Sequence, residues 1–200
     1  MDLQAIWFFL WGLLWAVYFM TDGFDLGIGT LMPFLAKSEE DRRVIVNAMG
    51  PLWDGNEVWL VTGGGALFAA FPEVYATVFS GFYIAFFVFL AALIFRAVAI
   101  EFRSKLPMPW WRSMWDISFS LGSLIAGLLL GVALGNIAWG IPLDERGVFI
   151  GTFVGLLHPY ALLTGVTVDV RRSDSGELVQ DRKSGSAGMP RPAVYLVCRL

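Results

Sequence analysis

The sequence predicts an all-α protein, a polytopic transmembrane helix bundle with about five membrane helices. Three observations lead to this prediction. First, 57% of the 200 residues are hydrophobic and only 16% are charged, whereas soluble domains have about 45–50% apolar and about 25% charged residues. Second, the chain has nine Trp residues, a residue type enriched at membrane interfaces. Third, apolar runs of about 20 residues, the length that crosses a bilayer, recur along the chain.

Five segments are candidate membrane helices. In chain order they are Leu3–Leu35, Pro51–Phe71, Val74–Arg96, Met114–Leu134 and Val148–Val168. The first lacks the basic start and the small-residue cleavage site of a signal peptide, so we interpret it as a retained helix. The second is the least regular, because it starts with the polar stretch WDGNEVW and has three glycines at positions 63–65. The third is the cleanest apolar span.

Basic residues in the connecting segments predict the orientation. They are concentrated in the links after the first, third and fifth helices: Lys37, Arg42, Arg43, Arg103, Lys105, Arg112, Arg171 and Arg172. The opposite links, 72–73 and 135–147, contain one basic residue, Arg146. Because basic residues stay on the cytoplasmic side, we expect the N-terminus outside and those three links inside.

Two segments are polar. Ser38–Asp41, followed by two arginines, predicts a short surface helix that Ser38 caps, which we interpret as a solvated connector. From Asp169 onward charged residues, Ser and Gly become frequent, and no apolar run is long enough to span. We therefore divide the chain into a transmembrane bundle, residues 1–168, and a polar, disordered cytoplasmic tail, residues 169–200.

Polar side chains gather near the cytoplasmic ends of the first four predicted helices. They are Asp22, Asp25, Asp54, Asn56, Glu57, Arg96 and Asp116. At 1.5 Å per residue, Asp54 lies about 5 Å and Glu57 about 9 Å into the second helix, and three-residue spacing places them on one face. Asp22 and Asp25 have the same spacing, at the inner boundary of the apolar core. Ionisable residues inside a membrane often mark ion or proton paths, so these residues are a candidate proton path.

Simpler interpretations of these acids stay open. Any single acid can serve as a helix cap, as Asp54 can at the start of the second helix, although Glu57 lies too deep for capping alone. A transporter or channel subunit is the alternative functional class, since a glycine-rich break beside acids is typical of a midplane site. The third possible function is a purely structural scaffold, in which the acids only cap helices.

A stripe of small residues in the fourth predicted helix indicates close packing rather than chemistry. Four small residues at intervals of four are Ser123, Gly127, Gly131 and Gly135. They predict a closely packed helix partner.

The sequence predicts no metal-binding, cofactor-binding or catalytic residue in this chain. His158 is its only histidine and Cys198 its only cysteine, while haem and metal sites usually need several donors in register. We expect His158, which precedes Pro159, to be a hydrogen-bonded membrane histidine. The glycines at 63–65 lack the lysine of a phosphate-binding loop.

Five motifs point to a known family. They are TDGFDLGIG at 21–29, WDGNEVWLVTGGGALFAAFPEVYATVFSGFY at 53–83, FRSK at 102–105, MWD at 114–116 and GN at 135–136. Over about residues 1–168 the chain resembles subunit II of cytochrome bd-type quinol oxidases. The resemblance ends abruptly near Val168, where the family continues with further apolar helices. We therefore interpret the chain as truncated or frameshifted after about residue 168.

The resemblance implies a subunit of a respiratory complex in the bacterial inner membrane. Such an oxidase transfers electrons from quinol to oxygen, forms water and generates a proton gradient. Haems b and d are expected in the partner, subunit I, with a small accessory subunit and a structural quinone as further possible companions. In the family the acid of the WDGN motif, here Asp54, belongs to the proton uptake route. Asp25, Arg96 and Asp116 are polar positions typical of the family.

Overall fold

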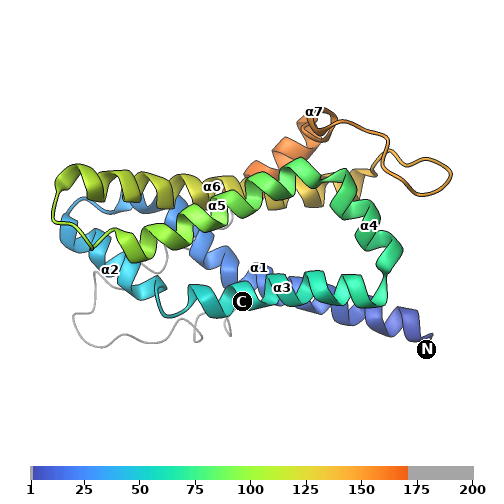
Figure 1. Ribbon diagram of the computed structural model, residues 1–200, viewed down its shortest axis with the longest axis horizontal. Helices are drawn as coiled ribbons and strands as arrows, with labels where there is room; N and C mark the ends of the chain where they lie inside the picture. The colour runs from blue at the N-terminus through green and yellow to red at the C-terminus, as the bar shows by residue number, and fades with distance from the viewer. Residues whose placement is uncertain (1, 171–200) are drawn as a thin grey trace.

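The computed structural model describes residues 2–170, and these fold into α-helices (Figure 1). The named helices are α1 (Leu3–Leu35), α2 (Glu39–Met49), α3 (Trp53–Ala70), α4 (Pro72–Gly81), α5 (Tyr83–Phe102), α6 (Pro109–Trp139) and α7 (Phe153–Leu156). Residues 159–170 form a further helix. Within the described part of the chain, the only β-type pairing is an isolated bridge between Leu143 and Phe149. The predicted all-α fold class is confirmed.

Within residues 2–170, three helices, α1, α5 and α6, are long and apolar enough to cross a membrane by length and composition. Helix α3 has 18 residues and carries Asp54 and Glu57 in its first turns. The exact number of spans and the outside position of the N-terminus stay predictions. The predicted tail of residues 169–200 lies outside the described residues from position 171 onward.

The third predicted span is wrong in one respect, because the chain breaks at Phe82 into α4 and α5. In Figure 1, α4 turns away from α5 toward α3. The loop of residues 140–152 packs against this break: a Cβ on Gly81 would lie 2.9 Å from Cγ of Phe149, and the Thr77 hydroxyl donates to the carbonyl of Gly147 at 2.8 Å.

The fifth predicted span is wrong in its first half. Residues 148–152 are not helical, and α7 has only four residues. A new helix starts at Pro159, because proline disfavours helical geometry in the preceding residue while fitting the first helical turn itself. Nδ1 of His158 accepts the backbone N–H of Ala161 at 3.4 Å, so His158 caps this helix.

Ser38 caps α2, as predicted: its hydroxyl accepts the N–H of Asp41 at 3.1 Å, and the Asp41 carboxylate accepts the N–H of Ser38 at 3.0 Å. However, α2 is not merely a solvated connector. Its apolar face, with Ile45, Val46 and Met49, is buried in a core cluster. That cluster also contains residues of α1, α5 and α6, namely Ile28, Met32, Ala99 and Phe119. Helix α2 thereby becomes part of one end of the bundle.

Helix α6 packs against α5 and α1, and α1 packs against α3. The small residues of α6 face two neighbours at short range. A Cβ on Gly29 of α1 would lie 2.1 Å from the Ser123 hydroxyl oxygen. Further along, a Cβ on Gly131 would lie 2.6 Å from Cα of Gly165, and one on Gly135 would lie 2.9 Å from Cα of Ala161. Residues 159–170 therefore lie backbone to backbone with α6.

Candidate functional site

The guanidinium of Arg96 on α5 is buried inside the bundle, with 1% of its side chain exposed. Nη1 of Arg96 donates to Oε1 of Glu57 at 2.9 Å and to Oδ1 of Asp22 at 3.4 Å. Its Nη2 lies 4.0 Å from Oδ2 of Asp25, which accepts the Asn56 amide at 2.7 Å. We call Asp22, Asp25, Asn56, Glu57 and Arg96 the Arg96 cluster.

Three helices build the Arg96 cluster. Asp22 and Asp25 are three residues apart on α1 and therefore point in similar directions. Asn56 ends the first turn of α3 and Glu57 begins the second, near the end of the helix where its dipole places a partial positive charge. Because α1 packs against both α3 and α6, while α5 packs along α6, one guanidinium meets carboxylates from two separate helices.

The Arg96 cluster contains more acids than bases. Three carboxyl groups face one guanidinium, and Asp22 and Asp25 are fully buried while 17% of the Glu57 side chain is exposed. A buried charge is stable only when it is paired or hydrogen-bonded. Such an arrangement can take up and release protons, with Glu57 as the acid in contact with the surroundings.

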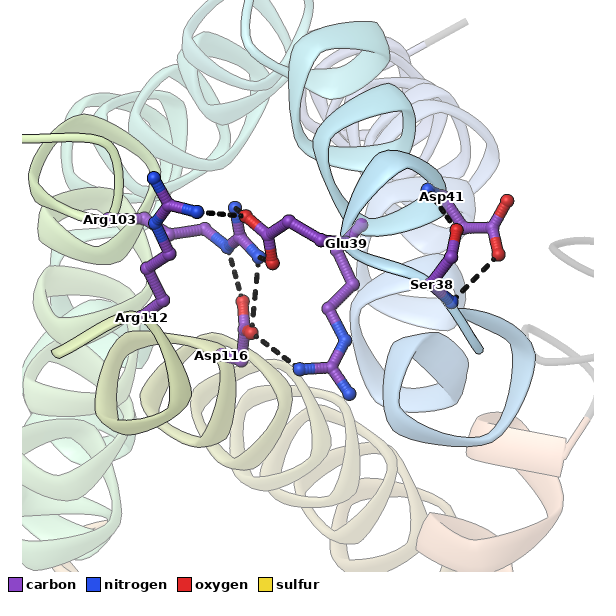
Figure 2. Close-up of polar contacts among 7 residues, drawn as sticks. Ser38, Glu39, Asp41, Arg103, Arg112 and Asp116 are labelled. Carbon is purple, nitrogen blue, oxygen red and sulfur yellow. Dashed lines mark hydrogen bonds and ion pairs between the residues drawn. The ribbon is translucent and has the colours of Figure 1, made fainter. Parts of the chain in front are cut away.

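A second ionic cluster lies where α5 ends and α6 begins. Figure 2 shows Arg103 between Glu39 of α2 and Asp116 of α6. Nε of Arg103 donates to Oδ1 of Asp116, and its Nη2 donates to Oε2 of Glu39 at 2.9 Å. Arg112 donates to Glu39 and Arg42 donates to Asp116, each at 3.1 Å. We call Glu39, Arg42, Arg103, Arg112 and Asp116 the Arg103 cluster. It ties α2 to α5 and α6.

The Arg103 cluster predicts a pH-dependent stability. The hydrogen bond from Arg103 lowers the pKa of Glu39 below its ordinary value of 4.5. A lowered pKa in the folded state stabilises the fold above the ordinary pKa, and this contribution is lost as the pH falls through the folded value. Because 40% of the Glu39 side chain is exposed, we expect Glu39→Gln to cost less than about 1 kcal/mol. Its melting temperature should fall below that of the wild type at pH 7.

Repeating the melting-temperature measurement at lower pH provides a control. The difference between wild type and Glu39→Gln should shrink as the pH is lowered below 4.5, because the wild-type carboxylate then takes up a proton. Glu40→Gln, an exposed position of the same turn, should show no such pH-dependent difference. Equal behaviour of the two variants across this pH range would contradict the role of Glu39.

The structure brings together five of the seven residues of the predicted path, all in the Arg96 cluster. Asp116 belongs instead to the Arg103 cluster, and Asp54 is exposed on α3. Buried Ala99 of α5 and Phe119 of α6 belong to the apolar core cluster. Ala99 follows Arg96 by three residues, and Phe119 follows Asp116 by three residues. An apolar layer therefore lies between the two ionic clusters.

Sequence reasoning missed the site role of Glu39, Arg42, Arg103 and Arg112. Arg42 and Arg112 were used in the prediction only as basic residues of connecting segments, and Arg103 also as part of the FRSK motif. One signal was available: Arg96 and Arg103 are seven residues apart, which places both on the same face of a helix about 10 Å apart along its axis. The sequence contained no comparable signal that α2 would bring Glu39 to Arg103.

His158 lies away from both ionic clusters. It lines a cavity of about 220 Å³ with Asn136, Trp139 and Thr152 between the end of α6 and α7. Its ring also lies near those of Trp139 and Tyr160, with centroids 5.8 and 6.2 Å away. Among the residues that the structure describes, no group of three or more His, Cys, Asp or Glu side chains is arranged to hold a metal ion.

Comparisons with known proteins show which proteins this chain resembles in sequence. The sequence model of the family described as cytochrome bd terminal oxidase subunit II matches residues 3–170. The chain is 48% identical over 168 residues to the cytochrome bd-I ubiquinol oxidase subunit 2 of Escherichia coli (strain K12), which covers 82% of this chain and 44% of that protein. It is 44% identical over 167 residues to the cytochrome bd ubiquinol oxidase subunit 2 of Bacillus subtilis (strain 168), covering 84% and 49%. The chain thus spans about half the length of these curated relatives.

Proposed function

This chain belongs to the cytochrome bd terminal oxidase subunit II family, and from that membership we propose that it is a membrane subunit of a bacterial quinol oxidase. The proposed complex oxidises quinol, reduces oxygen to water and generates a proton gradient across the inner membrane. The haems b and d belong to the partner, subunit I. A small accessory subunit and a structural quinone are further proposed companions. Family membership gives no support to the transporter or channel alternative.

The observation that supports a proton route is the Arg96 cluster, with its excess of buried acid and one partly exposed carboxyl group. Water formation consumes protons, and a buried haem site needs a polar route to supply them. Asp54 and Glu57 lie three residues apart on α3, so protons entering at exposed Asp54 can reach Glu57. From Glu57 the route continues through Asp22, Asp25 and Asn56, while Arg96 holds the carboxylates in place.

We assign Asp116 to anchoring rather than to this route. Among the described residues, Asp116 forms ion pairs with two arginines, Arg42 and Arg103. The apolar layer that contains Ala99 and Phe119 lies between Asp116 and the Arg96 cluster. Asp116 and Glu39 instead hold α2 against α5 and α6, where α2 closes one end of the bundle.

Asp54→Asn tests the route. We expect this variant to reduce oxygen several-fold more slowly while its complex keeps its haem content, because asparagine retains the size but cannot exchange a proton. The measurement is oxygen consumption with quinol, alongside the haem absorption of the purified complex. Glu73→Gln, an exposed acid on α4, is the matched control and should leave turnover unchanged. Unchanged turnover in Asp54→Asn would count against the route.

Copurification tests the assignment to an oxidase. The tagged chain, isolated from membranes in mild detergent, should carry with it a protein that has a haem absorption spectrum. If no haem protein accompanies the folded chain, its assignment as an oxidase subunit fails, whatever the behaviour of Asp54→Asn.

A further inference from the structure

Three oxidisable aromatic rings follow one another along α1. Their centroids are 6.2 Å apart between Trp11 and Trp15 and 5.7 Å apart between Trp15 and Tyr18. Both pairs meet edge to face, at interplanar angles of 75° and 84°, an arrangement that aromatic pairs favour. Indole and phenol are the aromatic side chains that most readily lose one electron, and electrons tunnel rapidly between rings in such close contact. We call Trp11, Trp15 and Tyr18 the α1 ring chain.

The α1 ring chain runs from an exposed part of the helix to a buried one. Leu3, near the start of α1, is 68% exposed, both indole rings are half-buried, and Tyr18 is 0% exposed. Asp22 follows Tyr18 by four residues, so the ring chain ends at the Arg96 cluster on the same face of α1. The Tyr18 hydroxyl lies close enough to Arg96 for its charge to act on the guanidinium.

The two indole rings have no base that could take their protons. Nε1 of Trp11 donates to the backbone carbonyl of Gly63 at 3.1 Å, and a carbonyl oxygen is too weak a base to remove this proton. Nε1 of Trp15 is buried and has no acceptor among the described residues. An oxidised indole therefore keeps its proton here and remains a radical cation, which can recover an electron from the next ring. Both indoles have the properties of relays.

Tyr18 is the ring of this chain whose proton has a destination. An oxidised phenol is a strong acid and loses its proton to any base within reach. Oδ2 of Asp22, one turn further along α1, is buried and accepts no hydrogen bond from the described residues. The Arg96 cluster contains three carboxyl groups and one guanidinium, so a proton taken up by Asp22 reduces its excess of negative charge. Electron loss coupled to this proton transfer leaves the radical on Tyr18.

We propose that the α1 ring chain is an electron-transfer chain, through which Tyr18 supplies single electrons to a strong one-electron oxidant, an organic radical or an oxidised metal complex, at the N-terminal end of α1. The oxidant takes one electron from Trp11. Trp11 recovers an electron from Trp15, and Trp15 recovers one from Tyr18, whose phenolic proton moves to Asp22. The products are the reduced oxidant, a neutral tyrosyl radical and a carboxylic acid. This activity does not rest on the assignment of the chain to an oxidase.

Photo-oxidation from a fixed point tests the proposal. The full chain is purified in mild detergent with Cys198→Ser, which removes its only native thiol, and with Leu3→Cys, to which a tris(bipyridine)ruthenium complex is attached. Position 3 lies about 22 Å from Tyr18 along the helix axis. Flash oxidation of the ruthenium and rapid freezing should give a tyrosyl radical by electron paramagnetic resonance, which deuterated tyrosine alters. Tyr18→Phe should remove this signal, and Tyr160→Phe, at an exposed tyrosine, should keep it.

Trp15→Phe tests the relay in the same labelled chain. Phenylalanine keeps an aromatic ring in place but is not oxidised by the ruthenium complex, so the yield of tyrosyl radical should fall at least tenfold. Trp139→Phe, at an exposed position of α6, should leave the yield unchanged. If Trp15→Phe melts well below the wild type, Trp11→Phe provides the same test nearer the exposed end. A yield that neither change lowers, or a radical that survives in Tyr18→Phe, would overturn the proposal.

Discussion

Arg96→Met is expected to abolish stable folding of the bundle. Methionine fits a similar volume but leaves buried Asp22 and half-buried Glu57 without their cation, and removing one partner of a buried ion pair typically costs about 3–5 kcal/mol. The unpaired carboxylates would lie where α1, α3 and α5 meet, so a rearrangement of one helix alone cannot relieve the loss of stability. The measurement is the yield of folded chain in mild detergent and its thermal unfolding.

Asp22→Asn gives the matched control for Arg96→Met. Alone, Asp22→Asn removes a partner of Arg96 and should destabilise the chain. In the Arg96→Met background the same change removes an uncompensated charge, so it should restore part of the lost stability. Interacting residues show such non-additive effects in a double-mutant cycle. Strictly additive losses would contradict the ion-pair explanation.

The depth of the Arg96 cluster could be predicted from the sequence because the rise of a helix is fixed. Residue counting placed Asp22, Asp25, Glu57 and Arg96 near one height, and the structure brings them into contact. The rotation of each helix about its own axis is not fixed by counting. Glu57 faces the interior while Asp54, three residues earlier, is exposed, since a step of three residues turns the direction by about 60° at 3.6 residues per turn.

The departures from the predicted fold have tertiary causes. The chain breaks at Phe82 in the middle of an apolar run, where no proline interrupts the pattern, and the loop that contains Phe149 packs against the break. The distinct environment of Asp116 depends on α2, whose partners come from distant parts of the chain. Pro159, in contrast, is a local signal, because proline starts helices readily and continues them poorly.

The two ionic clusters have different physical roles that follow from their charge balance. The Arg103 cluster has three arginines and two acids, so each carboxylate has a cation and none needs a proton. The Arg96 cluster has one arginine and three acids, so only protonation of a carboxyl group can reduce its excess of negative charge. The apolar layer at Ala99 and Phe119 keeps these environments separate. One end of the bundle can therefore be held by balanced ion pairs beside a site that contains an excess of acid.

Gly131→Ala is expected to be strongly destabilising, because the helix of residues 159–170 leaves no space beside α6. The new Cβ would lie 2.6 Å from Cα of Gly165 and 3.2 Å from its nitrogen, and these are backbone atoms that cannot rotate away. Overpacking of this kind typically costs about 1–3 kcal/mol. Gly64→Ala on α3 is the matched control, since a Cβ there meets nothing within 4 Å, and alanine should favour the helix by about 0.5–1 kcal/mol.

The two glycine variants should therefore shift thermal unfolding in opposite directions, although each adds one methyl group to a helix. Glycine costs stability in a helix interior, and at position 131 the close approach of the second backbone leaves no space for a Cβ. Limited proteolysis adds a local measurement: Gly131→Ala should increase cleavage in residues 140–152, the first part of the connection between the two packed helices, and Gly64→Ala should not. If Gly131→Ala melts at or above the wild-type temperature, the close contact between α6 and residues 159–170 does not exist in the folded chain.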